Sequence, residues 1–214
     1  MIIADSGSTD STHKILEEMK QSYPQLVVLS DTGKQHGPEV IALYRYAILQ
    51  GADYIFQTDS DGQTDPSEFG TFWDMRTRYD AIIGCRQIRE DGKFRAFVEQ
   101  VVCFMLKIYF GVKVKDANAP FRLMKADVVE KYIGRFSADY SLPNIMMTAF
   151  FAYYNEKIFF IPITFRPRKS GTNSINLPKI IKIGWRALGE FAMFKKDMQA
   201  GIRGNADGFE KERN

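Results

Sequence analysis

Short apolar runs alternate with longer amphipathic segments along the first third of the chain. The apolar runs typical of β-strands are residues 2–5, 26–29, 54–58 and 81–85. Between them, apolar side chains recur every three or four residues, which is the period of a helix that buries one face. These helical segments are residues 12–19, 39–50 and 66–78. The alternation predicts an α/β fold, in which a Rossmann-like, mostly parallel mixed sheet is flanked by helices and joined by right-handed crossovers.

The second half of the chain is richer in helical and aromatic segments. Its predicted helices are residues 94–110, 126–132, 142–154 and 177–198, and its predicted strand is residues 158–165. Residues 116–123 are typical of a loop or a short strand. We expect one α/β domain over residues 1–175, an amphipathic C-terminal helix within 176–200, and a polar, glycine-rich tail over 201–214 that is disordered.

Composition narrows the classes of function. The chain has 214 residues, of which 45% are hydrophobic and 26% charged, and this suffices for one domain with a sizeable core. A formal net charge of +3 is far from the dense basic surface of a nucleic-acid-binding protein, so we expect no nucleic-acid partner. Cys85 and Cys103 lie in apolar stretches without metal-ligand spacing, which indicates reduced thiols and a cytoplasmic location.

Two carboxylates follow the third predicted strand. Residues 54–66 have the sequence YIFQTDSDGQTDP, so Asp59 and Asp61 stand one residue apart at a strand end. Open α/β sheets bind their ligands along the carboxyl ends of the strands. Carboxylate oxygens suit Mg²⁺ or Mn²⁺, which take one or two carboxylates together with substrate phosphates. A solvated loop is the alternative interpretation of the same residues.

A second acidic motif follows the first predicted strand. Residues 4–10 have the sequence ADSGSTD, in which a strand ends at Asp5 and a Ser/Gly turn leads into a helix. One interpretation is a capped strand-to-helix turn that binds nothing. The other is a nucleotide site, in which the Asp5 carboxylate accepts hydrogen bonds from a base.

Taken in order, these motifs resemble those of glycosyltransferase family 2, which has the GT-A fold. Besides ADSGSTD and DSDGQ, the matching segments are IIGCR at 82–86, DANAPFRLMKADVV at 116–129 and RPRKSGTNSIN at 166–176. The chain looks most like the dolichyl-phosphate mannose synthase-like enzymes, which glycosylate a polyprenyl phosphate. The family's first strand and helix have no counterpart before ADSGSTD, so the resemblance implies a GT-A domain that is incomplete at its N-terminus.

The resemblance implies a role for the residues of both acidic motifs. Asp5 and Ser6 would contact the nucleotide. Asp59 and Asp61 would hold the metal and the donor diphosphate, and Gln63 would complete the metal's ligands. Breaking a sugar–diphosphate bond leaves extra negative charge on the nucleotide, so a divalent cation and basic side chains are needed there.

Basic and polar residues further along the chain would serve the same reaction. Arg86, Arg166 and Arg168 suit the leaving diphosphate because a guanidinium binds phosphate in a bidentate fork. Ser170 and Ser174 would belong to a polar segment that folds over the donor, and a plain solvent loop is the alternative.

Three positions keep more than one interpretation. Asp116 would be a general base toward an acceptor hydroxyl, a residue that orients arginines or the donor sugar, or a loop-capping aspartate. Arg122 would bind the donor or form a structural ion pair. Relatives often carry a small serine where this chain has Glu99. A glutamate beside an incoming phosphate is unfavourable, which leaves membership of the lipid-phosphate subgroup open.

The function implied is metal-dependent transfer of a sugar from a UDP- or GDP-sugar donor to an acceptor, with inversion at the sugar. The acceptor would be a polyprenyl phosphate or another glycan precursor of the cell envelope. Two alternatives stay open. One is a non-catalytic accessory protein that keeps the fold, and the other is a sugar nucleotidyltransferase.

Residues 177–198 bear on where the protein acts. The segment combines lysines and an arginine with isoleucines and aromatic residues, a pattern that predicts peripheral contact with the inner face of the membrane. An ordinary helix packed on the core gives the same pattern and is the alternative.

Overall fold

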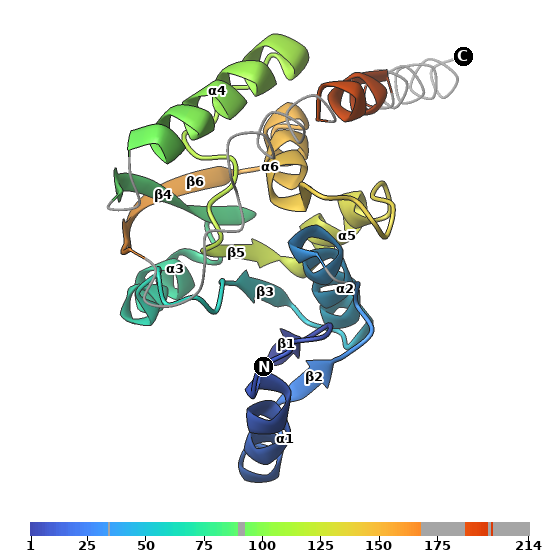
Figure 1. Ribbon diagram of the computed structural model, residues 1–214. Coiled ribbons are helices and arrows are strands. Elements are labelled where there is room, and N and C mark those ends of the chain that lie inside the picture. The colour runs from blue at the N-terminus through green and yellow to red at the C-terminus, as the bar shows by residue number, and fades with distance from the viewer. Residues whose placement is uncertain (34, 90–92, 168–186, 197, 199–214) are drawn as a thin grey trace, which may run out of the picture.

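The computed structural model describes residues 1–33, 35–89, 93–167, 187–196 and 198, which form helices around two β-sheets (Figure 1). The strands are β1 (Ile2–Ala4), β2 (Val27–Leu29), β3 (Tyr54–Gln57), β4 (Ala81–Arg89), β5 (Arg122–Lys125) and β6 (Ile158–Phe165). The helices are α1 (Thr12–Ser22), α2 (His36–Leu49), the 3₁₀ turn η1 (Pro66–Glu68), α3 (Phe69–Met75), α4 (Lys93–Phe110), α5 (Ala126–Ile133) and α6 (Pro143–Tyr153). Residues 187–196 are also helical.

Four of the strands form a mixed sheet in the order β3–β5–β4–β6. β5 runs antiparallel to β3 and β4, whereas β4 and β6 run parallel, so three strands share one direction. The predicted mostly parallel, mixed sheet with flanking helices is confirmed. β4 is longer than predicted because it pairs with β6 over most of that strand's length, with a register shift between Cys85 and Ile88.

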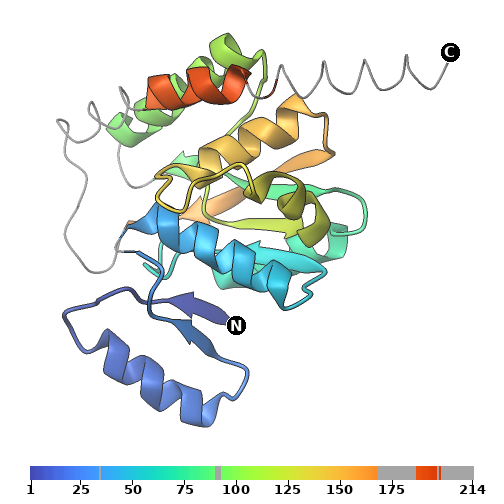
Figure 2. The same cartoon turned by 90° about the vertical axis from the view of Figure 1, so that its right-hand side faces the viewer.

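The two N-terminal strands form a sheet of their own, in which β1 and β2 are parallel. Figure 2 shows the β1–α1–β2 unit below the rest of the molecule, with α2 leading from it into the main body. A cavity of about 310 Å³ separates the two sheets. It is lined by Met1 and Ile2, by the consecutive residues 54–58, and by side chains of α2. Within the described residues, β1 and β3 therefore border this cavity without pairing with each other.

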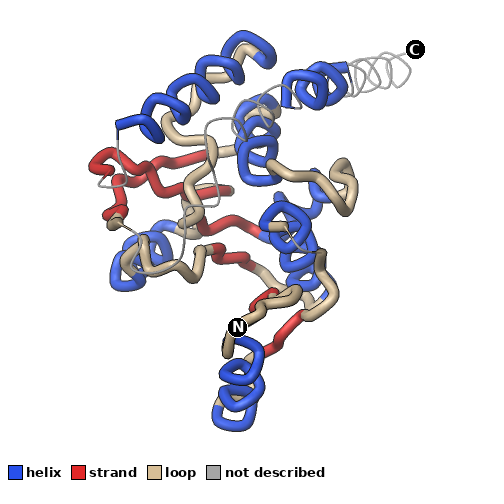
Figure 3. The backbone as a smooth tube through the Cα atoms, in the orientation of Figure 1, coloured by secondary structure: helices blue, strands red, loops and turns tan. Residues whose placement is uncertain are grey.

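The four-stranded sheet separates two hydrophobic cores because successive residues of a strand point to opposite faces. On β4, Ala81 and Ile83 belong to the larger core, and Ile82 belongs to the smaller one. Helices α2, α4, α5 and α6 cover the larger core, while α3 covers the smaller core with the buried Phe72. Figure 3 shows the strands lying between these helices.

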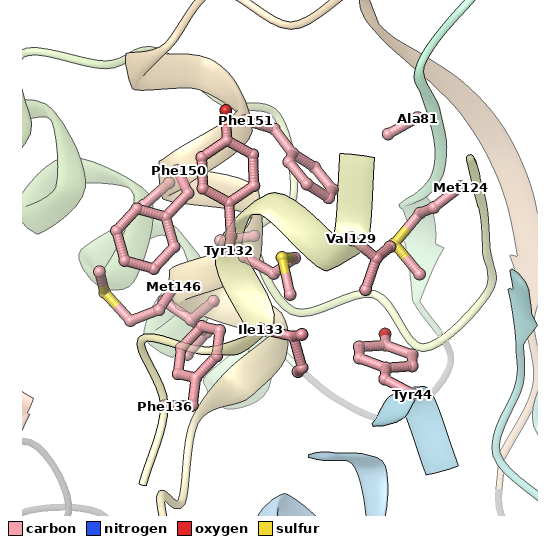
Figure 4. Packing of buried hydrophobic residues seen from close by; sticks show 14 of the residues in the cluster. Tyr44, Ala81, Met124, Val129, Tyr132, Ile133, Phe136, Met146, Phe150 and Phe151 are labelled. Carbon is pink, nitrogen blue, oxygen red and sulfur yellow. The ribbon is translucent and has the colours of Figure 1, made fainter. Parts of the chain in front are cut away.

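Aromatic side chains dominate the larger core (Figure 4). Tyr132 of α5 stacks on Phe150 of α6 with 5.5 Å between the ring centroids. Phe194, from the helix at residues 187–196, reaches Phe136, Tyr140 and Phe150 at centroid distances of 5.4 to 5.8 Å. The C-terminal helix is thus anchored where it is described.

The helix predicted at residues 177–198 is described only at 187–196 and 198. Phe191 and Phe194 are buried there, so this part packs on the core, as the alternative interpretation expected. Membrane contact through the preceding residues and disorder of the tail over 201–214 concern residues that lie outside the described ones. Among the described helices, none has both the length and the apolarity that crossing a bilayer requires.

Candidate functional site

The DSDGQ loop begins where β3 ends. Asp61 Oδ1 accepts a hydrogen bond from the backbone N–H of Gln63 at 3.1 Å, which closes a tight turn around Gly62. Gly62 has a φ of +71°, a left-handed conformation that glycine adopts without strain. The turn therefore keeps Asp59 and Asp61 at the carboxyl end of the strand.

A distant segment is bonded to this loop. Gln63 is buried, and its Nε2 donates to the carbonyl of Arg166 at 2.9 Å. The backbone N–H of Arg166 donates in return to the carbonyl of Gln63 at 2.8 Å. The guanidinium of Arg166 donates through Nη2 to Asp65 Oδ2 at 2.6 Å. The structure thus brings Arg166 to the loop that carries the two aspartates.

Within this loop, the pKa of Asp59 is raised above its usual value. Burial raises the pKa of Asp59, and the neighbouring charge of Asp61 raises it further. The charges of His36, Arg86 and Arg122 act in the opposite direction without cancelling the rise. A desolvated carboxylate next to a second one is a group that a bound cation stabilises.

The two carboxylates fit a small divalent cation. Mg²⁺ is usually held in proteins by one or two carboxylates, with water and substrate phosphates in the other positions. In the part of the chain that the structure describes, no three His, Cys, Asp or Glu side chains form a metal site of their own. The donor set matches a cation that binds together with a diphosphate. The role of Gln63 as a further ligand stays a prediction.

The ADSGSTD turn is capped from within. Asp5 is buried and accepts hydrogen bonds from the N–H of Ser8 at 3.2 Å and from the Ser8 hydroxyl. Its other carboxylate oxygen lies 3.4 Å from His13 Nδ1. The hydrogen bonds from Ser8 hold the pKa of Asp5 below its usual value. Ser6 is bonded to the hydroxyl and, at 3.1 Å, to the N–H of Thr32. This geometry favours a capped turn, and nucleotide contact by Asp5 and Ser6 stays a prediction.

The first turn of α2 links the two acidic motifs. The charge of His36 acts on both Asp59 and Glu39, and the charge of Asp5 also acts on Glu39. Burial raises the pKa of Glu39. His36 therefore acts on Glu39 and on Asp59, and Glu39 in turn lies within the electrostatic influence of Asp5. Sequence reasoning gave His36 and Glu39 no role, although their place at the start of the helix that follows β2 was an available signal.

A buried ion-pair cluster joins β4 to α4 and to the segment before β5. Arg86 donates through Nε and Nη2 to the two oxygens of Asp116, each at 2.8 Å, as a bidentate pair. Arg86 Nη2 also donates to Glu99 Oε2 at 3.0 Å. Glu99 Oε1 accepts the N–H of Ala117 at 2.8 Å, and Asp116 also accepts the N–H of Asn118 at 3.1 Å. Both oxygens of Asp116 are thus engaged.

The two carboxyl groups of this cluster, Glu99 and Asp116, have pKa values shifted in opposite directions. Burial raises the pKa of Glu99, and the charge of Asp116 raises it further. Burial acts in the same direction on Asp116, but hydrogen bonds and charge from Arg86 outweigh it, so the pKa of Asp116 is lowered. Asp116 is therefore the more acidic of the two carboxyl groups. Sequence reasoning considered Glu99 only as an obstacle to a phosphate and missed its bond to Arg86.

Arg122 is fully buried and bonds mainly to main-chain carbonyls. Its guanidinium donates to the carbonyls of Ala117, Ala119 and Asn144 at 2.7 to 3.3 Å and to the hydroxyl of Thr148 at 3.3 Å. These bonds tie the segment before β5 to α6, which favours a structural role for Arg122. The other assigned residues, Arg168, Ser170 and Ser174, lie outside the described residues.

Residues 1–133, more than half of the chain, match the family model described as Glycosyl transferase family 2. The chain belongs to glycosyl transferase family 2. The match spans both acidic loops, the Arg86–Asp116 pair and β5. The family assignment therefore covers most of the residues that form the candidate site.

Two curated relatives of this family 2 chain carry undecaprenyl phosphate in their names. The undecaprenyl-phosphate mannosyltransferase of Micrococcus luteus is 24% identical over 185 residues, or 82% of this chain and 75% of the relative. The undecaprenyl-phosphate 4-deoxy-4-formamido-L-arabinose transferase of Pseudomonas fluorescens is 22% identical over 131 residues, or 61% of this chain and 38% of the relative. The predicted resemblance to polyprenyl-phosphate glycosyltransferases is confirmed.

Solved structures identify the fold of this family 2 chain as GT-A. Glucosyl-3-phosphoglycerate synthase from Mycobacterium tuberculosis, in complex with phosphoglyceric acid, matches with a TM-score of 0.55 and 16% identity. The same synthase with Mn²⁺, UDP-glucose and glycerol 3-phosphate matches with a TM-score of 0.54 and 15% identity. The match covers 80% of this chain but only 61% of the synthase, so the chain spans less than two thirds of that protein.

Proposed function

We propose that this chain transfers a sugar from a UDP- or GDP-sugar to a polyprenyl phosphate, with Mg²⁺ or Mn²⁺ at Asp59 and Asp61. The observation that carries the proposal is the DSDGQ loop, which holds two carboxylates at the end of β3 and bonds to Arg166. Family membership supports the reaction class, and the names of the two curated relatives support the acceptor class.

The donor side of the reaction rests on the chain's own charges. Asp59 and Asp61 would hold a divalent cation, which would neutralise the negative charge that develops on the departing diphosphate. Arg166 brings a guanidinium to the same loop, where it is paired with Asp65 in the free chain. Exchanging Asp65 for a donor phosphate would keep that charge paired. Asp5 and Ser6 would contact the nucleotide from the separate β1–β2 sheet.

The state of Asp116 supports a phosphate acceptor. Both of its oxygens are engaged with Arg86 and its pKa is lowered, so it is a poor base for removing a hydroxyl proton. An ionised phosphate needs no base. One of its oxygens forms a bond to the anomeric carbon as the bond from that carbon to the donor diphosphate breaks, and this single displacement inverts the carbon. Asp116 then has an orienting role, in which it fixes Arg86.

Donor binding is the first test. Calorimetric titration of UDP- and GDP-linked glucose and mannose in the presence of Mn²⁺ should detect binding of at least one donor. Asp61→Ala should lose that binding, whereas Asp74→Ala, which removes an exposed carboxylate on α3, should retain it. The proposal fails if none of these donors binds the wild-type chain.

One observation favours a second candidate, a non-catalytic member of the family. The ADSGSTD and DSDGQ motifs stand on separate sheets with a cavity between them. Incubation with undecaprenyl phosphate in detergent and a labelled donor decides between the two, since any wild-type turnover rules out the second.

The product released in this assay also distinguishes a transferase from a nucleotidyltransferase. A transferase releases a nucleoside diphosphate, whereas the nucleotidyltransferase considered from the sequence would release pyrophosphate.

A further inference from the structure

Four large apolar side chains of α4 point away from the core. Phe97, Val101, Phe104 and Ile108 are 60%, 38%, 60% and 61% exposed. Their spacing of four, three and four residues places them along one face of the helix. We call these four residues the α4 stripe. Single exposed apolar side chains are ordinary on a protein surface, but a continuous row of them marks an interaction site.

The opposite face of α4 already has its partners. Leu106 and Phe110 are buried in the larger core, and Glu99 bonds to Arg86 and to the N–H of Ala117. The helix is therefore apolar on both faces, and packing within the chain accounts for one of them. The α4 stripe needs a partner outside the core.

The surface around the α4 stripe is basic. Lys107 is exposed on the same side of the helix, and Lys113 and Lys115 are exposed just beyond its end. Glu99, the one acidic residue in the sequence of α4, is turned inward to Arg86. The stripe is thus accompanied by positive charge without an exposed acidic residue from the same helix.

A second helix extends this surface. Figure 2 shows the helix at residues 187–196 beside α4, and its Phe191 lies 6.0 Å from Tyr109 and 5.7 Å from Phe110 between ring centroids. On this helix, Met193 is 61% exposed and Lys196 is also exposed. Two neighbouring helices therefore each present an exposed apolar and an exposed basic side chain.

We propose that the α4 stripe docks on an anionic lipid surface. The helix lies in the plane of the bilayer, with its four apolar side chains at the boundary between headgroups and acyl chains and its lysines against anionic headgroups. A second copy of this chain is the other occupant to consider. Pairing two copies through this face would bring two basic surfaces together, which costs free energy, whereas an anionic bilayer complements them.

The same helix connects this surface to the candidate site. Glu99 stands between Phe97 and Val101 in sequence but on the inner face, where it holds Arg86 beside Asp116. Docking would bring that cluster close to the bilayer, where a lipid-linked acceptor resides. Only this last step rests on the proposed function.

Sedimentation with vesicles tests the surface. The full chain should bind vesicles of equal parts phosphatidylcholine and phosphatidylglycerol more strongly than vesicles of phosphatidylcholine alone, and added salt should weaken the binding. The double variant Phe97→Ser/Phe104→Ser should reduce the partition coefficient on the order of tenfold because two large apolar side chains no longer enter the lipid. The matched control is Ile15→Ser/Leu49→Ser, which removes side chains that are 49% and 79% exposed on α1 and α2 and should change nothing.

Three outcomes would overturn the proposal. The first is that the wild-type chain does not bind the anionic vesicles, and the second is that the two double variants lose binding equally. The third is that Phe97→Ser/Phe104→Ser only dissociates a dimer in sedimentation velocity. Circular dichroism checks the fold of each variant, and Val101→Ser/Ile108→Ser poses the same question if the first pair does not fold. No donor, metal or turnover enters these measurements, so a negative result leaves the proposed reaction untouched.

Discussion

Asp59 carries a charge that folding makes costly. Because the pKa of Asp59 is raised in the folded chain, the folded state binds a proton more tightly than the unfolded state between the usual value of 3.8 and the folded value. Stability therefore falls as pH rises through that window and stays lower above it. Asp59→Asn should raise the melting temperature at pH 7 in metal-free buffer and abolish donor binding.

Thermal unfolding from pH 4 to pH 8 measures this difference between Asp59→Asn and the wild type. Asp74→Asn, on the exposed side of α3, is the control and should leave the curve unchanged. A lower melting temperature for Asp59→Asn across the whole range would show that the carboxylate stabilises the fold, against the expectation. A gain in stability together with a loss of binding is typical of a functional charge.

The pKa of Asp116 is shifted in the opposite direction to that of Asp59. Although burial opposes its ionisation, Arg86 lowers the pKa of Asp116, so its contribution to stability is complete above 3.8 and is lost as pH falls through the folded value. Asp116→Asn should cost about 3 to 5 kcal/mol at pH 7, since one partner of a buried ion pair is removed. Urea unfolding measures this cost, and Glu17→Gln, in an exposed pair with Lys20, should change little.

Single residues were predictable from sequence where their geometry is local. Asp59, Asp61 and Gly62 follow one another in a turn, so their spacing alone carries the information. Glu99 and Arg86 meet only because α4 packs against β4, and nothing near either residue in sequence signals that bond. The bond between Gln63 and Arg166 likewise has no local signal, although the family resemblance had assigned both residues to the donor site.

At the scale of elements, the packing around Gly37 in the first turn of α2 leaves no room for a Cβ atom. A Cβ added at Gly37 would lie 2.3 Å from the carbonyl oxygen of Tyr140 and 2.7 Å from Ser141 Cα. Both are backbone atoms, so α2 would have to shift. Gly37→Ala should cost about 1 to 3 kcal/mol in unfolding free energy. Donor affinity should fall with it because the preceding residue, His36, acts electrostatically on Asp59.

Gly70→Ala in α3 is the matched control for that variant. A Cβ at Gly70 meets nothing within 4 Å, and alanine is the better helix former by about 1 kcal/mol. Chemical denaturation should therefore move the two variants in opposite directions. Equal stability of Gly37→Ala and the wild type would mean that α2 yields at this contact.

Elements with a clear hydrophobic period were predicted best. Residues 158–165 were predicted as a strand and form β6 with the same bounds. Residues 116–123 were predicted as a loop or short strand, and the strand β5 begins only at Arg122, since its bounds depend on pairing with β3 and β4. The hydrophobic period of the C-terminal segment predicted a helix. It did not predict what the apolar face of that helix contacts, because burial in a core and contact with lipid produce the same pattern.

At the scale of the whole molecule, the strands divide into two sheets, which the sequence alone did not predict. Which strands pair is decided by contacts between distant segments, and the alternation of strands and helices is the same for one sheet or two. The β1–β2 unit has only two strands and packs on α2, whereas the other sheet is covered on both faces. Two-stranded units are marginally stable by themselves.

Hydrogen exchange should therefore separate the two sheets. Backbone amides of β1 and β2 should exchange faster than those of β4 and β5, because a small unit opens at a lower free energy than the global transition. Mass spectrometry of peptides from residues 1–33 and 81–89 measures the difference. Uniform protection across both regions would instead indicate one cooperative unit.

The cavity between β1 and β3 has a thermodynamic consequence for any ligand that touches both acidic motifs. Such a ligand contacts both sheets at once. Its binding would therefore order a β1–α1–β2 unit that opens independently, and part of the intrinsic affinity would offset that cost. That ordering buries apolar surface of the chain itself as well as surface of the ligand. The binding heat capacity would then be more negative than the ligand's own buried area explains.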